Sequence, residues 1–342
     1  MDTEHAFSTK PGRWLSQRDT LANANMEWEE FYREHRSIVP DLTGSVGQFR
    51  QTMHQAKMRA QQYGRPIVHG LEIHEYTAVS QTGIEVPLRL YKSLSSKANG
   101  AVMIYFHGGG WAMGDLDGED NTCRLLCVEG DLHVVSVGYR LAPENPYPAA
   151  VLDSITAFHW VSDNYRTHGF DVDKIYVGGT SAGATLAVVL CQLTLALGVS
   201  IQGQLLRAPV LCCSELYHHR MGLRSMTEYI DTPILNRQSM KQFFDWYQPG
   251  GLERPIISPL LSPMLDKSPP SFLMICGQDP LRDEALAYAD RIEKACVPLR
   301  VALYPGMPHA FWIFPELSTT KAATQDLISG LRWLLSHSKS TN

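Results

Sequence analysis

The chain has 342 residues, 44% of them hydrophobic and 19% charged, so it suits one large α/β domain with insertions and excludes a disordered chain. Its formal net charge of −5, without a cluster of lysines and arginines, argues against a nucleic-acid-binding surface. No apolar run approaches the roughly 18 residues of a membrane span, and the opening residues lack the basic start and apolar stretch of a signal peptide. We therefore expect a cytoplasmic protein without a membrane span.

The first part of the chain, residues 1–60, is predicted to be helical and amphipathic, with aromatic side chains on an otherwise polar stretch. Leu71–Val79 and Glu85–Tyr91 have the composition of strands, and the Gln-Thr-Gly turn between them indicates a hairpin. Buried strands then alternate with helices, which predicts an α/β fold with a mostly parallel sheet and helices on both faces. The predicted strands are 101–106, 133–139, 175–177, 204–211, 272–276 and 299–304, and the predicted helices are 149–165, one from about 182, 281–294 and 320–336.

One stretch, residues 213–255, interrupts this alternation with a helix-like sequence between two strands. Insertions at the carboxyl ends of parallel strands lie over the ligand crevice. We therefore expect residues 1–60 and about 213–255 to form a helical cap on a catalytic domain spanning 61–342. Aromatic side chains of both pieces, including Phe31, Phe243 and Phe244, are candidates for substrate binding. Simple docking of these rings onto the core is the alternative.

A serine between glycines, in Gly179-Thr180-Ser181-Ala182-Gly183, follows the strand 175–177 and precedes a helix. In a G-x-S-x-G turn the serine hydroxyl is lifted clear of the sheet, and the helix N-terminus directs N–H groups to the same place. The pattern alone is only suggestive. The strand before it and the helix after it make Ser181 a candidate nucleophile.

Three consecutive glycines, in His107-Gly108-Gly109-Gly110-Trp111, directly follow the buried strand 101–106. Glycines there let the backbone approach a ligand closely with free N–H groups, which is what an oxyanion hole requires. A flexible glycine loop is the alternative. His107 has the wrong position for the base, so we assign it a structural role in orienting the loop.

A serine nucleophile needs a base oriented by a carboxylate, and α/β-hydrolases place them in the chain order Ser, acid, His. Asp279 and His309 follow the strands 272–276 and 299–304, at the same sheet edge as Ser181. Asp283 is the rival acid, although a helix-dipole interaction would explain it equally well. The competing histidines, expected at the surface or in packing, are His54, His69, His74, His218, His219 and His337.

The seven cysteines stand mostly in apolar runs, which favours buried, reduced thiols. No second Cys/His pair at metal-ligand spacing accompanies Cys123 and Cys127. We therefore expect neither a metal nor a cofactor.

Five motifs, in this order along residues 85–315, resemble those of the hormone-sensitive-lipase-like family of α/β-hydrolases: HGGGWAMGD, YRLAPENPYPAA, GTSAG, DPLRDE and HAF. The resemblance implies an eight-stranded α/β-hydrolase sheet, a helical cap built from the N-terminus and an insertion, and hydrolysis of carboxylic esters. It carries over Ser181 as nucleophile, His309 as base and Asp279 as acid. The oxyanion N–H groups that it implies are those of Gly108, Gly109 and Ala182.

The chain also departs from the commoner family pattern. Thr180 places it in the GTSAG branch, some members of which form homodimers. Asn145 stands where YRLAPEH has histidine, and Ala310 where HGF has glycine. None of these differences removes a catalytic group, so they bear on substrate preference and leave the chemistry intact.

We expect a serine carboxylesterase that hydrolyses esters of small hydrophobic substrates, with Trp111 as a further candidate substrate contact. The same triad acting on a lactone, a thioester or an acyl-transfer substrate is the main alternative. A non-catalytic small-molecule receptor is a remote alternative, because the related plant receptors lack the histidine that stands here at position 309.

Overall fold

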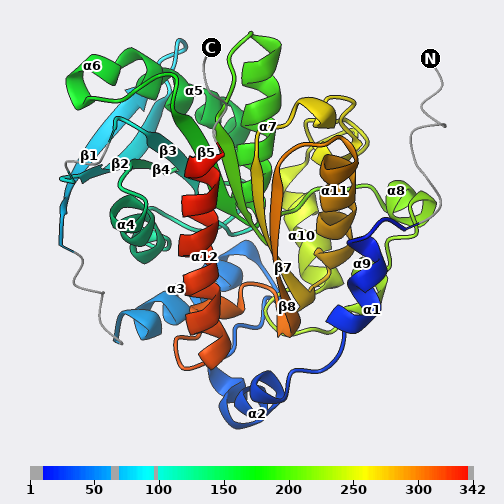
Figure 1. Cartoon of the computed structure of the whole chain (residues 1–342). Coiled ribbons are helices and arrows are strands. Elements are labelled where there is room, and N and C mark those ends of the chain that lie inside the picture. Colours follow the sequence, from blue (N-terminus) through cyan, green and yellow to red (C-terminus); the bar gives the residue numbers. More distant parts are fainter. Residues whose placement is uncertain (1–10, 63–68, 96–98, 338–342) are drawn as a thin grey trace.

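The computed structural model describes residues 11–62, 69–95 and 99–337. An eight-stranded sheet forms its centre, with the strand order β1-β2-β4-β3-β5-β6-β7-β8 (Figure 1). The strands are β1 (Leu71–Val79), β2 (Glu85–Ser93), β3 (Val102–Phe106), β4 (His133–Val137), β5 (Ile175–Thr180), β6 (Gly203–Arg207), β7 (Ser271–Gln278) and β8 (Leu299–Pro308). β2 pairs antiparallel with both β1 and β4, and all other neighbouring strands are parallel. The predicted leading hairpin and mostly parallel sheet are confirmed.

Helices cover both faces of this sheet and one of its ends. They are α1 (Arg18–Leu21), α2 (Met26–His35), α3 (Val46–Gln62), α4 (Asp120–Glu129), α5 (Ala149–Asp163), α6 (Tyr165–His168), α7 (Ala182–Ala196), α8 (Glu215–Arg220), α9 (Ser225–Glu228), α10 (Arg237–Tyr247), α11 (Arg282–Lys294) and α12 (Ser318–Ser336). In Figure 1 the N-terminal helices, in blue, lie beyond one end of the sheet, and α12, in red, crosses one face.

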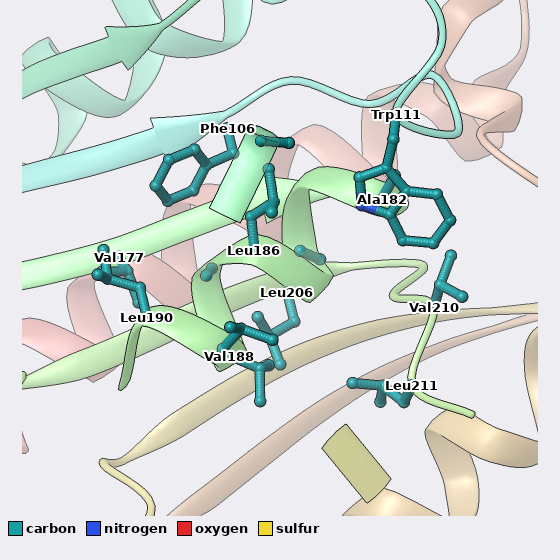
Figure 2. Close-up of a cluster of buried hydrophobic side chains, with 14 of the residues drawn as sticks. Phe106, Trp111, Val177, Ala182, Leu186, Val188, Leu190, Leu206, Val210 and Leu211 are labelled. Atoms are coloured by element: carbon teal, nitrogen blue, oxygen red, sulfur yellow. The ribbon is translucent and has the colours of Figure 1, made fainter. Parts of the chain in front are cut away.

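The hydrophobic core consists of two clusters, one on each face of the sheet. On one face α5, α7 and α11 pack against the strands, and Figure 2 shows Leu186 and Leu190 of α7 beside Val177 and Leu206 of the sheet. On the other face α4 and α12 cover the strands, with Cys127 among the buried residues. Because both faces are covered, every residue of the central strands β3, β5 and β6 is buried. This explains the mostly apolar sequences of β3 and β5.

The element boundaries differ from the predicted ones where the strands end. β5, β7 and β8 run on to Thr180, Gln278 and Pro308, so each leads directly into a predicted site residue. The predicted strand 204–211 is wrong in its second half, because β6 stops where Ala208 turns into the left-handed region (φ 43°). The predicted helix 149–165 is likewise split into α5 and α6.

The segments 11–62 and 213–255 contact each other and the sheet end. Phe49 of α3 packs edge-on against Phe243 and Trp246 of α10, with ring centroids 5.3 and 4.9 Å apart. The side chain of Arg50 donates to the carbonyl oxygen of Ala112, 2.8 Å away, in the loop after β3. Glu27 of α2 accepts a hydrogen bond from the hydroxyl of Thr319 at 2.7 Å, in the first turn of α12.

Several chain-wide features also follow from the structure. The seven cysteines are all within its described part and form no disulfide; six are buried and Cys296 is exposed. Across residues 11–62, 69–95 and 99–337, no helix is long and apolar enough to cross a bilayer. The same ranges contain no group of three or more His, Cys, Asp or Glu side chains arranged to hold a metal ion.

Candidate active site

Ser181 occupies the sharp turn between β5 and α7, with φ 55° and ψ −120°. A non-glycine residue rarely adopts this conformation, and the surrounding packing enforces it. A Cβ on Gly179 would lie 2.4 Å from the carbonyl carbon of Gly183, and a Cβ on Gly183 would lie 2.2 Å from the carbonyl oxygen of Phe106. The backbone N–H of Ser181 donates to the carbonyl oxygen of Arg207 at 2.8 Å. The two glycines therefore let the turn sit directly on the ends of β3 and β6.

The structure brings Ser181, His309 and Asp279 together. Nε2 of His309 lies 3.1 Å from Oγ of Ser181, and Nδ1 of His309 lies 2.6 Å from Oδ2 of Asp279. A carboxylate only accepts hydrogen bonds, so Nδ1 carries the proton and Nε2 presents its lone pair to the serine hydroxyl. The other carboxylate oxygen of Asp279 accepts the N–H of Leu281 at 2.9 Å. Both oxygens of this carboxylate are therefore fixed.

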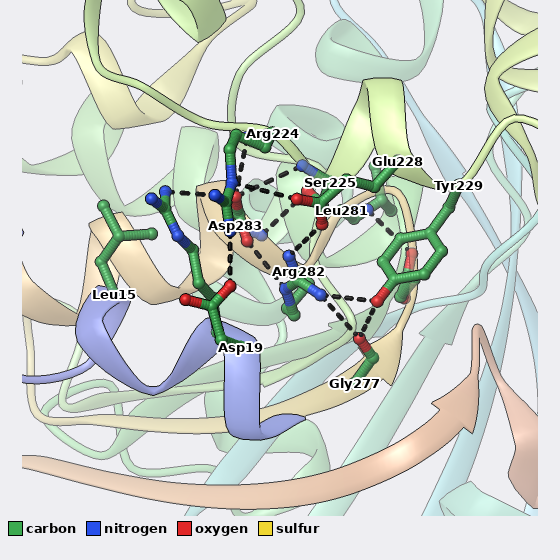
Figure 3. A network of polar contacts seen from close by, with 12 residues as sticks. Leu15, Asp19, Arg224, Ser225, Glu228, Tyr229, Gly277, Leu281, Arg282 and Asp283 are labelled. Carbon is green, nitrogen blue, oxygen red and sulfur yellow. Dashed lines mark hydrogen bonds and ion pairs between the residues drawn. The ribbon is translucent and has the colours of Figure 1, made fainter. Parts of the chain in front are cut away.

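Asp283, the rival acid, faces a different set of partners (Figure 3). Its carboxylate accepts from Nε of Arg282 at 2.7 Å and from the backbone N–H of Arg224, also at 2.7 Å. Its own backbone N–H donates to the hydroxyl of Ser225 at 3.1 Å. Asp283 is completely buried in this network, which joins α11 to α9. It accepts nothing from His309 in the described chain.

The glycine loop lies against the serine turn. A Cβ on Gly108 would lie 3.2 Å from the carbonyl oxygen of Thr180, so the two segments are in direct backbone contact. Gly109 has φ 119°, and its carbonyl accepts the N–H of Met113 at 3.0 Å, which closes the loop into a tight turn. Within the part of the chain that the structure describes, the backbone N–H groups of Gly108, Gly109 and Ala182 have no hydrogen-bond acceptor. These N–H groups remain available to a ligand.

His107 stabilises the glycine loop by a hydrogen bond and by ring stacking. Its Nδ1 donates to the carbonyl oxygen of Gly108 at 2.8 Å, and its ring stacks on Tyr139 with centroids 4.1 Å apart. The hydroxyl of Tyr139 donates in turn to the carbonyl oxygen of His107 at 2.9 Å. Burial lowers the pKa of His107, so the ring is neutral at pH 7. The contacts agree with the structural role predicted for it.

The predicted substrate-binding aromatic residues fall into two groups. Trp111 stacks on Tyr247 with centroids 4.5 Å apart and lies 6.2 Å from Phe244, while a Cβ on Gly110 would lie 2.2 Å from the ring of Phe243. Trp111, Phe243 and Phe244 therefore gather at the glycine loop.

Phe31, by contrast, belongs to the cluster on the other face. It stacks on His35 and packs against Phe314, with centroids 4.6 and 5.1 Å apart. This placement favours the docking interpretation for Phe31.

The Ser181 site is nearly closed. Ser181 and His309 are 7% and 6% exposed, and Asp279 is 1% exposed. A hollow of about 730 Å³ lies elsewhere, between the N-terminal residues and α11, and its lining includes Arg18, Met221 and Asp290. Another hollow of about 330 Å³ lies behind His107. Neither hollow is lined by the serine, the histidine or the aspartate of the site.

Sequence reasoning missed a buried arginine beside the site and a buried ion pair elsewhere in the interior. Arg207 ends β6 directly under the serine turn, and an arginine closing the apolar stretch Gln-Leu-Leu-Arg is a signal that could have revealed it. His218 was expected at the surface or in packing; its Nε2 lies 3.2 Å from Glu284 in the interior. The spacing between positions 218 and 284 gave no hint of that pair.

Comparisons with known proteins agree with this geometry. A family model described as the alpha/beta hydrolase fold matches residues 103–313. An AB hydrolase superfamily protein of Schizosaccharomyces pombe is 31% identical over 329 residues, covering 94% of this chain and 96% of the relative. The carboxylesterase NlhH of Mycobacterium tuberculosis is 35% identical over 264 residues, covering 75% of this chain and 81% of that protein. The crystal structure of vibralactone cyclase superposes with a TM-score of 0.85 at 27% identity, covering 92% of this chain and 96% of that one. The chain therefore belongs to the hormone-sensitive-lipase-like family of α/β-hydrolases, a family of carboxylic ester hydrolases.

Proposed function

We propose that the chain is a serine carboxylesterase with Ser181 as nucleophile, His309 as general base and Asp279 as the acid that orients it. The observation that carries this proposal is the unbroken contact from carboxylate to imidazole to hydroxyl, at 2.6 and 3.1 Å. A serine hydroxyl is a weak nucleophile unless a base takes its proton as it attacks. The fixed Nδ1 tautomer of His309 provides that base at Nε2.

The reaction then proceeds in two halves. Ser181 Oγ attacks the ester carbonyl while His309 takes the hydroxyl proton, and the resulting imidazolium is stabilised by Asp279. The tetrahedral intermediate collapses, His309 returns the proton to the leaving alcohol, and an acyl-enzyme remains. Water repeats the sequence and releases the acid.

The negative charge of each intermediate needs prearranged hydrogen-bond donors. We assign this role to the backbone N–H groups of Gly108, Gly109 and Ala182, because they have no acceptor in the described chain and their two segments touch. Loss of one such donor costs roughly 10²–10³ in kcat in enzymes of this type.

The segments 11–62 and 213–255 serve, in this proposal, as the cap over the site. Support comes from Phe49 and Phe243, which pack together across the two segments, and from the contact of Phe243 with Gly110. A phenyl ring directly on the glycine loop leaves little space beside the reacting carbonyl. We therefore expect small hydrophobic acyl groups to be preferred.

A second candidate function uses the same residues for acyl transfer to an alcohol, including lactone chemistry. The near closure of the site supports it, because a shielded acyl-enzyme would react more readily with a bound hydroxyl than with water. The similarity to a protein named vibralactone cyclase points the same way. Product analysis on esters that carry an internal hydroxyl group separates lactone formation from hydrolysis.

The decisive experiment compares wild-type protein with Ser181→Ala. Ester hydrolysis on a panel of p-nitrophenyl esters should disappear in the variant, and a fluorophosphonate probe should add its mass to the wild type only. Circular dichroism should show that the variant is folded. A probe that still attaches to the folded variant would refute the assignment of the nucleophile.

A further inference from the structure

Arg207 is a buried charged residue for which the proposed mechanism has no use. It is the last residue of β6 and only 4% exposed, and its Nε is buried without a hydrogen-bond partner among the described residues. Its one carboxylate partner in the described chain, Glu119, lies 3.3 Å from Nη1. Burying a guanidinium with so few strong hydrogen bonds costs stability, and an apolar side chain would close this strand end at lower cost. We therefore look for a functional role for Arg207 that offsets this cost in stability.

The contacts of Arg207 reach three segments at or near the site. Nη1 lies 3.5 Å from the hydroxyl of Thr180, the residue before Ser181, and the backbone carbonyl of Arg207 accepts the N–H of Ser181 itself. The guanidinium carbon lies 4.4 Å from the ring centroid of Trp312, three residues after His309.

The third segment follows the glycine loop and begins α4. There Nη1 lies 3.2 Å from the hydroxyl of Thr122, next to the ion pair with Glu119. Nη1 is also 3.4 Å from the hydroxyl of Tyr105 in β3, which itself lies 3.0 Å from the hydroxyl of Thr180. One side chain thus contacts the residue before the nucleophile, a residue shortly after the base, and the start of α4.

We propose that Arg207 is a positioning residue: it clamps Thr180 on one side and Trp312 on the other, and so fixes the distance between Ser181 and His309. This inference rests on the proposed serine mechanism. A planar guanidinium suits the task, because it stacks flat on an indole while its edge donates to several hydroxyls. Displacing reacting groups by about 1 Å costs on the order of 10² in rate.

The test uses Arg207→Met, which keeps the length of the side chain without its charge, and Arg207→Lys, which keeps the charge without the planar stacking surface. For Arg207→Met we expect kcat to fall roughly 10- to 100-fold, with KM within about two-fold of wild type. Phosphonylation of Ser181 by a small fluorophosphonate should slow in parallel, because that reaction requires the same alignment but little substrate binding. Arg207→Lys should recover only part of the rate.

Arg89→Met is the matched control. Arg89 is also largely buried and ion-paired, to Glu75, Asp117 and Asp120; it shares the start of α4 with Arg207 but contacts neither Thr180 nor Trp312 in the described chain, so it controls for the loss of a buried charge there. It should lose thermal stability and keep kcat. If Arg207→Met and Arg89→Met lose the same factor in kcat per folded molecule, the loss follows from reduced stability in general, and the inference is overturned.

A folded Arg207→Met protein with kcat within three-fold of wild type would also overturn it. If Arg207→Met does not fold, Arg207→Lys and Thr180→Val are judged by the same criteria, since Thr180→Val removes the contacted hydroxyl at nearly constant volume. Ser181→Ala separates the two proposals. Labelling of Ser181→Ala by the fluorophosphonate would refute the serine mechanism together with this inference. If Ser181→Ala is inactive and unlabelled while Arg207→Met keeps its activity, only the inference about Arg207 is refuted.

Discussion

The strand-end turns and the helical segments around them are built in different ways. Ser181, Asp279 and His309 each follow within one residue of a strand end, so the sheet itself determines where they lie. The segments 11–62 and 213–255 lie against that edge through side chains, such as Phe49, Arg50 and Glu27. Backbone geometry thus locates the three proposed catalytic residues, while side-chain packing locates the groups around them. Substitutions in the first region should therefore alter turnover, and substitutions in the second should alter stability or substrate choice.

Asp279 and Asp283 show this contrast within one short stretch. Both carboxylates are buried, and they lie close together in the sequence. Asp279 lies in the turn after β7 and reaches His309, whereas Asp283 lies inside α11 and reaches the 213–255 segment through Arg224. In the proposed mechanism the same chemical group therefore serves the reaction in one place and the packing of the surrounding helices in the other.

The largest effect is expected for Asp279→Asn. The amide keeps the shape but can donate to Nδ1 of His309, which favours the wrong tautomer and removes the charge that stabilises the imidazolium. We expect kcat to fall by up to ~10⁴, with little change in melting temperature. Steady-state kinetics and thermal unfolding on the same preparation measure both. A large loss of stability with kcat retained would show that Asp279 serves packing and not the reaction.

Asp283→Asn should give the reverse result. The substitution removes the nearest charge partner of the fully buried guanidinium of Arg282, which keeps Glu228 at 2.8 Å, so we expect a loss of about 1–3 kcal/mol of unfolding free energy. Turnover should remain close to wild type, because nothing links Asp283 to His309 directly. Urea unfolding gives the free energy and p-nitrophenyl ester hydrolysis gives the rate. If Asp283→Asn loses several orders of magnitude in kcat while Asp279→Asn does not, the acid assigned here is wrong.

Phe243→Ala tests whether the surrounding helices select the substrate. Removing the ring from the glycine loop should make space for longer acyl groups and raise kcat/KM for octanoate relative to acetate by roughly ten-fold. Phe158→Ala removes a ring of equal size from α5, on the sheet face, and should destabilise the protein without altering that ratio. If the ratio of kcat/KM for octanoate to that for acetate is the same in wild type and Phe243→Ala, Phe243 does not line the acyl pocket. Deleting residues 1–35 is a weaker test, because it also removes Trp28 and Glu27, which support the segment after His309 and α12.

The sequence predicted much of the first region and little of the second. G-x-S-x-G and the three glycines are local patterns, and the rule of parallel strands brings Asp279 and His309 to the same edge, so their meeting could be predicted. Contacts such as Phe31 with Phe314 join positions far apart in the chain, and no local pattern encodes them. The end of β6 was predicted wrongly because Val210 and Leu211 are buried in an irregular loop, and burial alone resembles a strand.

The smallest effect concerns His218, which ties the 213–255 segment to α11. Burial alone would lower its pKa, but interactions with the side chains of Cys212 and of Glu284, whose carboxylate lies 3.2 Å away, outweigh it and raise the pKa to about 10. A pKa raised in the folded state means stability that is present below the unfolded value of about 6.5 and lost as the pH rises through 10. Between pH 7 and 10 the wild type should therefore lose at least about 1.4 kcal/mol, the equivalent of one pKa unit, relative to His218→Gln. Urea unfolding of both proteins at pH 7, 8, 9 and 10 measures this difference. If the unfolding free energies of the two proteins change in parallel with pH, His218 is neutral in the folded protein, and the 213–255 segment is held to α11 by packing alone.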